Sequence, residues 1–121
     1  MEEYNLIVAG GRDFTDEQLL AAELEKLANT ELKAFAVNIV TGMARGADRL
    51  VYLYALEHGV MHHKFYADWD RLGRRAGIVR NEEMGRFADG LLAFWDQKST
   101  GTKHMIEFMR AQQKPVRVIH Y

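Results

Sequence analysis

The chain has 121 residues, no cysteine and a formal net charge of −1 at pH 7. This length predicts one domain over residues 1–121, and a composition of 48% hydrophobic and 27% charged residues is typical of a folded protein. The lack of cysteine excludes disulfides and thiolate chemistry, and the near-neutral charge gives no global attraction to nucleic acid or anionic membranes. Without a leader-like N-terminus or an apolar run of about 20 residues, we expect a cytoplasmic protein with no membrane partner.

Short apolar runs alternate with amphipathic segments along the chain. In order they predict a strand over 5–9, a helix over 16–29, a strand over 36–40, a helix over 47–58, a strand over 60–66, a polar loop over 67–77, a helix over 77–87, a strand over 91–95, a helix stopped by Pro115 and a strand over 116–120. Thr15 and Gln18 resemble a capping box for the first helix. The alternation predicts an α/β fold, a three-layer arrangement with a mainly parallel five-stranded sheet and helices on both faces.

Ligands of such sheets lie outside the carboxyl ends of the strands, and the turn from Gly42 to Asp48 is the first candidate there. It contains Gly42, Arg45 and Gly46 and leads directly into a helix. Unpaired backbone N–H groups beside the positive end of the helix dipole suit a phosphate or carboxylate. The alternative is a plain strand-to-helix turn, in which the glycines only ease the bend.

Polar segments also follow the first, third and fourth strands. The first strand ends in Gly10, Gly11, Arg12 and Asp13. Together the strand ends gather eight of the sixteen Lys and Arg at one edge of the sheet, namely Arg12, Arg45, Arg71, Arg74, Arg75, Arg80, Lys98 and Lys103. Each charge alone is explained by solvent exposure, but their joint position beside glycine turns favours an anionic ligand.

Arg80 and Asn81 lie four and three residues before Met84, on the stripe of their helix that faces the core. A buried arginine needs a partner. That partner is either an internal carboxylate, from Asp13, Asp48 or Asp96, or an anionic ligand, which we favour.

The segment Ser99, Thr100, Gly101 and Thr102 predicts a second phosphate-binding turn, with ordinary helix capping as the alternative. Trp69 and Trp95 are candidates for stacking on a base, although Trp95 equally suits the core. No residue set has metal-ligand spacing, and the standard dinucleotide, P-loop and nucleophile-elbow motifs are missing. We therefore expect no metal and no cofactor.

Four segments, VAGGRDF at 8–14, TGMARGAD at 41–48, AGIVRNEEM at 76–84 and STGT at 99–102, together resemble the YspA-like, YpsA-related branch of the SLOG superfamily, a group also labelled DUF2493. The resemblance runs over nearly the whole chain. It implies a Rossmann-like fold and a nucleotide or nucleotide-derived ligand.

Relatives in this superfamily include the LOG phosphoribohydrolases, which cleave the N-glycosidic bond of nucleoside 5′-monophosphates. The resemblance matches Arg80 to their helix arginine, and Gly101 and Thr102 to the end of their P-G-G-x-G-T-x-x-E loop. Lys98, Ser99 and Thr100 differ from the start of that loop, and Met105 stands where their glutamate falls. The resemblance therefore implies the binding half of the relatives' site more strongly than the catalytic half.

Three hypotheses follow. The first is a sensor or carrier that binds a nucleotide or an ADP-ribose-like molecule. Its candidate ligand-binding residues are Gly10, Gly11, Arg12, Gly42, Arg45, Gly46, Asp48, Arg80, Asn81, Ser99, Thr100, Gly101 and Thr102. The second is a nucleotide N-glycosidase with catalytic candidates Arg80, Asp13 and Asp96. The third is recognition of nucleic-acid ends by the basic edge; it is the weakest of the three, and we do not expect a nucleic-acid partner. A homo-oligomer is compatible with each hypothesis.

Overall fold

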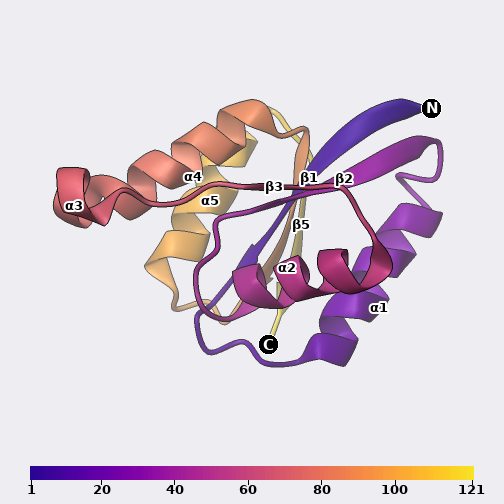
Figure 1. The fold of residues 1–121 in the computed structure, drawn as a ribbon, viewed down its shortest axis with the longest axis horizontal. Helices are drawn as coiled ribbons and strands as arrows, with labels where there is room; N and C mark the ends of the chain where they lie inside the picture. Colours follow the sequence, from indigo (N-terminus) through magenta and orange to yellow (C-terminus); the bar gives the residue numbers. More distant parts are fainter.

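The computed structural model describes residues 1–121, and its five strands and five helices alternate along the chain (Figure 1). The strands are β1 (Glu2–Gly10), β2 (Phe35–Thr41), β3 (His62–Lys64), β4 (Gly90–Trp95) and β5 (Val116–His120). The helices are α1 (Glu17–Asn29), α2 (Ala47–His58), α3 (Trp69–Leu72), α4 (Ala76–Phe87) and α5 (Thr100–Ala111). A short 3₁₀ turn, Gly73–Arg75, joins α3 to α4. No helix is both long and apolar enough to span a lipid bilayer.

All neighbouring strands run parallel, in the order β3-β2-β1-β4-β5. The chain builds outward from β1 to β3 and then returns to β4 on the other side of β1. The strand order therefore reverses between β1 and β4, where loops leave the sheet in opposite directions and open a crevice. This parallel, three-layer, Rossmann-like α/β fold confirms the predicted fold class.

Two apolar clusters fill the two faces of the sheet because alternate side chains of each strand point in opposite directions. Leu6 and Val8 of β1 face one cluster, which α1 and α2 cover. Ile7 and Ala9 face the other, which α4 and α5 cover. Burial of β1 on both faces explains its nearly continuous apolar sequence.

Two predicted details of the elements are wrong. Asp16, rather than Thr15, caps α1, because its carboxylate accepts the Leu19 N–H at 3.0 Å. The third strand spans three residues instead of seven, since β3 lies at the sheet edge and pairs only with β2.

The segment predicted as a polar loop over 67–77 is largely helical. Asp68 caps α3 by accepting the Arg71 N–H at 3.2 Å and its Nε–H at 3.0 Å. The 3₁₀ turn then leads directly into α4, which begins at Ala76. Figure 1 shows α3 projecting from the body of the molecule beside the carboxyl ends of the strands.

Candidate functional site

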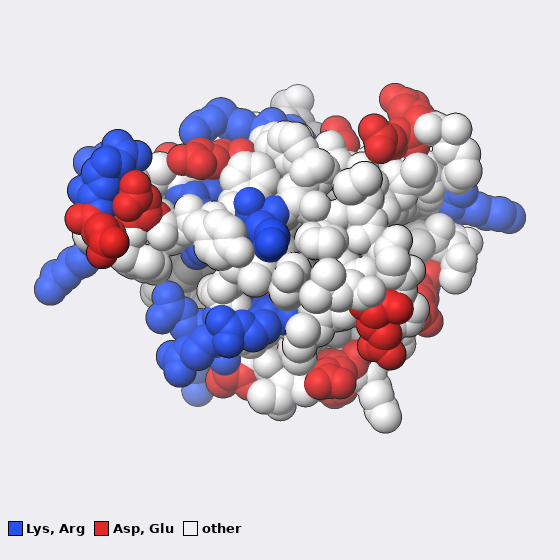
Figure 2. All heavy atoms as spheres, viewed as in Figure 1, with Lys and Arg blue, Asp and Glu red and all other residues white.

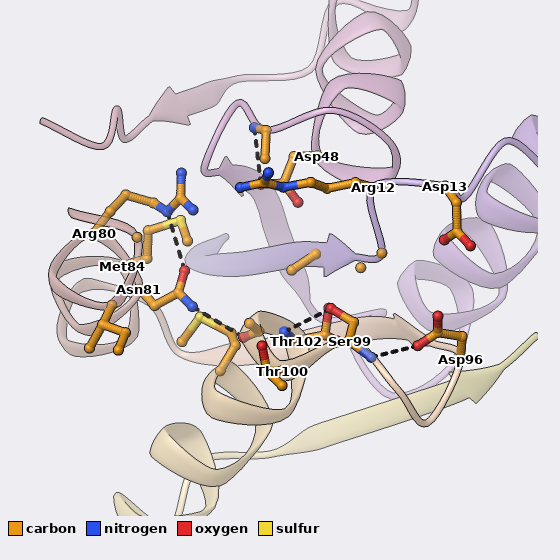
Figure 3. A pocket seen from close by; sticks show the side chains of 18 of the residues that line it. Arg12, Asp13, Asp48, Arg80, Asn81, Met84, Asp96, Ser99, Thr100 and Thr102 are labelled. Carbon is orange, nitrogen blue, oxygen red and sulfur yellow. Dashed lines mark hydrogen bonds between the residues drawn. The ribbon is translucent and has the colours of Figure 1, made fainter. Parts of the chain in front are cut away.

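A cavity of about 670 Å³ opens at the reversal point of the sheet. Its walls come from the turn after β1, the turn after β4, α3, α4 and the first turn of α5 (Figure 3). Ten of the predicted ligand-binding residues line it: Gly10, Gly11, Arg12, Asp48, Arg80, Asn81, Ser99, Thr100, Gly101 and Thr102. The parallel sheet brings these residues together from four separate parts of the sequence.

The turn after β2 differs from the predicted phosphate cradle. The buried carboxylate of Asp48 folds back over this turn and accepts the Ala44 N–H at 3.3 Å. The backbone N–H groups of Gly10 and Gly42 also stabilise this carboxylate. The Asp48 carboxylate therefore accepts hydrogen bonds from backbone N–H groups that were predicted to bind an anionic ligand.

Burial raises the pKa of Asp48 to about 6, because the low-dielectric interior disfavours its charged form. The Arg80 charge and the surrounding N–H groups oppose that rise. Asp48 thus combines a position on the cavity wall with titration near neutral pH, which is unusual for a carboxyl group.

Gly46 lines neither this cavity nor the smaller hollow beside it. Its φ of 82° lies in the left-handed region, and an added Cβ would stand only 2.8 Å from the Arg12 Cα atom. The next residue, Ala47, donates its N–H to the Gly11 carbonyl at 3.4 Å. The start of α2 is therefore packed against the turn after β1, and Gly46 permits that close approach.

Arg80 and Asn81 connect three elements through hydrogen bonds. Arg80 donates from Nη1 to the Gly42 carbonyl at 2.7 Å and from Nε to Asn81 Oδ1 at 3.2 Å. The Asn81 Nδ2 group donates to the Gly101 carbonyl at 3.2 Å. These hydrogen bonds join α4 to the turn after β2 and to the first turn of α5, and they fix the positions of the cavity walls relative to one another.

The predicted need of Arg80 for a partner is met partly from within. Burial lowers the pKa of Arg80, and the charge of Asp48 opposes that change. The two groups form no ion pair within 4.0 Å, and neither Asp13 nor Asp96 pairs with Arg80. A carbonyl and a more distant carboxylate therefore share the stabilisation, and the cation still faces the cavity.

The first turn of α5 presents polar groups to the cavity. Ser99 caps the helix by accepting the Thr102 N–H at 3.4 Å. The N–H groups of Thr100 and Gly101 have no acceptor within the chain, as is usual for the first residues of a helix. Space is open around Gly101, because no atom would lie within 4 Å of an added Cβ. Capping and anion binding, offered as alternatives by the sequence, are compatible in this turn.

Asp13 and Asp96 line the cavity, but both accept hydrogen bonds from the chain. Asp13 accepts the Tyr121 hydroxyl at 2.6 Å. Asp96 accepts the Lys98 and Ser99 N–H groups, each at 2.8 Å, and these bonds lower its pKa. Both carboxylates therefore position loops, and Asp48 is the carboxylate that lies deepest in the site.

Figure 2 shows Lys and Arg gathered on the side of the molecule that carries α3 and the start of α2, with acidic residues among them over α3. Four of the eight predicted rim cations line the cavity: Arg12, Arg74, Arg80 and Lys98. Arg45 is exposed and lines a neighbouring hollow together with Gly42. The other three, Arg71, Arg75 and Lys103, line neither space.

The structure also adds residues that sequence patterns assign to other roles. Met84 and Met105 are buried core residues that also form part of the cavity wall. Arg49 lies in the first turn of α2 and lines the neighbouring hollow together with Arg45, which precedes that helix.

Comparison with known proteins identifies the family. The model of the YspA, cpYpsA-related SLOG family matches residues 4–72. The Gene 61 protein of Mycobacterium phage D29 is 32% identical over an alignment that covers 96% of this chain and 94% of the phage protein.

A solved structure shares the fold at low sequence identity. DNA processing protein A from Helicobacter pylori, described for its single-stranded DNA binding mode, superposes with a TM-score of 0.72 at 18% identity. The match covers 95% of this chain but 64% of the Helicobacter chain. The family match over more than half of the residues, the phage relative and this shared fold agree, and the chain belongs to the YspA, cpYpsA-related SLOG family.

Proposed function

We propose that this protein binds a nucleotide or a nucleotide-derived molecule such as ADP-ribose, as a sensor or carrier. The observation that carries the proposal is the first turn of α5, where two residues whose N–H groups have no acceptor within the chain line a cavity together with several cations. A helix N-terminus of this kind favours phosphate through its N–H groups and its dipole. Arg12 and Lys98 line the same cavity and add full positive charges.

The rest of the cavity suits the organic part of such a ligand. Its volume of about 670 Å³ falls inside the range of about 300–1,000 Å³ that is usual for small-molecule sites. The Trp69 side chain lies on its wall and is half exposed, so that a ring face is available to a base. Phosphate at α5 and a base near α3 would place the sugar beside Asp48 and Asn81.

Gly101→Asp tests the phosphate position with little risk to the fold. The space around Gly101 is open, and a carboxylate in the first turn of a helix is favourable for the helix itself. The same carboxylate repels a phosphate, whereas Gly101→Asn adds a neutral side chain of equal size. We expect AMP or ADP-ribose to bind Gly101→Asp about tenfold more weakly than Gly101→Asn, as measured by calorimetry.

A thermal-shift screen with AMP, ADP, ATP, NAD and ADP-ribose selects the probe, because a ligand of the folded state raises the melting temperature. Equal affinities of the two Gly101 variants would exclude phosphate from the start of α5. No binding of any of these compounds by the wild-type protein would refute the proposed function.

A nucleotide N-glycosidase is the second candidate, and the observation in its favour is Asp48. A carboxylate on the cavity wall with a pKa of about 6 suits proton transfer or stabilisation of an oxocarbenium-like transition state. Chromatography of the AMP mixture would reveal free adenine if the reaction occurs. Asp48→Asn would then abolish its release, whereas Asp13→Asn, at the hydrogen-bonded rim carboxylate, would leave most of it.

Single-stranded nucleic acid is a third candidate, supported by the fold shared with the Helicobacter DNA processing protein and by the cations around the cavity. Binding of this kind weakens steeply with salt because phosphate contacts release counterions. Fluorescence anisotropy of a labelled oligothymidylate at about 50 and 200 mM salt would show that loss. Nucleotide binding without measurable oligonucleotide binding would exclude this candidate.

A further inference from the structure

A second hollow of about 300 Å³ adjoins the main cavity. Its walls come from the turn after β2, the start of α2 and the segment between β3 and α3. The two spaces share four wall residues, Arg12, Ala44, Trp69 and Arg80. They are therefore neighbouring compartments of one recess, with two cations at the boundary between them.

The charged side chains that line the second hollow are all positive. Four arginines line it, namely Arg12, Arg45, Arg49 and Arg80, and no carboxylate does. None of these arginines takes part in an ion pair. Four like charges around one small space repel each other unless an anion lies between them. The hollow therefore has the electrostatic character of a site for phosphate.

Two aromatic side chains complete this hollow. Tyr66 is 66% exposed and Trp69 is 50% exposed, although large aromatic side chains usually bury most of their surface. Both follow β3 and line the hollow together with Arg45 and with Arg49 of α2. Planar rings beside guanidinium groups suit a ligand that carries both a flat ring and a negative charge.

We propose that this hollow is a second subsite, which takes another phosphate-bearing nucleoside unit, so that the full ligand is a two-unit nucleotide. This inference rests on the proposed function, because the first unit occupies the main cavity. In Figure 3 the Arg12 side chain extends from the turn after β1 past Asp48 toward Arg80. The phosphate that links the two units would lie between these two guanidinium groups, and Arg45 and Arg49 would contact the outer unit.

The experiment compares AMP with the 5′-phosphorylated dinucleotide pApA by calorimetry. The wild-type protein should bind pApA at least about tenfold more tightly than AMP, since the second unit adds charge-assisted contacts. The double variant Arg45→Ala with Arg49→Ala removes two exposed side chains from the outer wall. It should bind AMP within about twofold of wild type and lose most of the preference for pApA.

The matched control, Arg71→Ala with Arg75→Ala, removes the same charge from residues that line neither space and should keep the preference. Equal binding of AMP and pApA by the wild type, with AMP still weakened by Gly101→Asp, would overturn the second subsite and leave the proposed function standing. An equal loss of both ligands in the Arg45 and Arg49 variant would also overturn it, because the arginines would then act only through general charge. Failure of both ligands to bind the wild type would refute both proposals.

Discussion

Asp48→Asn should change how the stability of the protein depends on pH. Burial raises the pKa of Asp48 from 3.8 to about 6 in the folded state. Between these values the folded protein holds a proton that the unfolded chain has lost, so the free energy of unfolding falls as pH rises. At about 1.4 kcal/mol per pKa unit, the difference corresponds to about 3 kcal/mol. Asparagine does not titrate, and the variant lacks this contribution.

Urea unfolding of both proteins at several pH values from 4 to 7 measures the effect. The stability of wild type minus that of Asp48→Asn should decrease by about 2 kcal/mol across this range, since the remainder of the effect falls below pH 4. Asp68 and Asp96 have lowered pKa values in the folded state, so their contributions to the free energy of unfolding increase as pH rises through the acidic range. Both proteins contain these residues, and the two contributions cancel in the difference. The control Asp70→Asn removes an exposed carboxyl that accepts no hydrogen bond, and it shows how much of the change comes from the loss of one negative charge alone. A flat difference for Asp48→Asn would show that the carboxyl is not desolvated as described.

Two further substitutions test the turns that shape the site. Gly46→Val should lower the free energy of unfolding by at least about 2 kcal/mol, because a β-branched residue disfavours positive φ and its Cβ would meet backbone atoms; thermal melting measures this, and a wild-type melting temperature would contradict it. Ser99→Ala should remove the cap of α5 at a cost of about 1 kcal/mol. Urea unfolding measures the free energy of unfolding of this variant and of Ser99→Asn, in which asparagine can still cap the helix and should restore the stability. An equal loss in both variants would show that the effect does not come from capping.

The sequence was informative wherever one local pattern determined the outcome. Runs such as 5–9 and 91–95 are apolar on both faces, and only a strand covered by helices on both sides buries them fully. The helix predicted over 47–58 ends at His58, because Gly59 follows it with φ of 64°. The positions of Arg80 and Asn81 on the inner stripe of α4 also followed from helical spacing, and both line the cavity.

Patterns failed where distant groups decide the geometry. Local sequence cannot show that the Asp48 carboxylate turns back onto the amides of its own turn, because that contact also involves Gly10, far away in the chain. The helical turn at α3 depends on a cap from Asp68 in a segment whose charge resembles a loop. The second hollow combines α2 with residues that follow β3, a juxtaposition set by the sheet order alone.

The two edges of the sheet bear on how the protein behaves at high concentration. Parallel sheets with open edges tend to recruit strands from other molecules and aggregate. Here β3 offers only three residues at one edge and ends in Lys64, whose ammonium lies 5.3 Å from the centre of the Tyr52 ring. At the other edge β5 carries Arg117, which pairs with Glu31. A short edge on one side and a charged edge on the other disfavour growth of the sheet from molecule to molecule, and with it fibre formation.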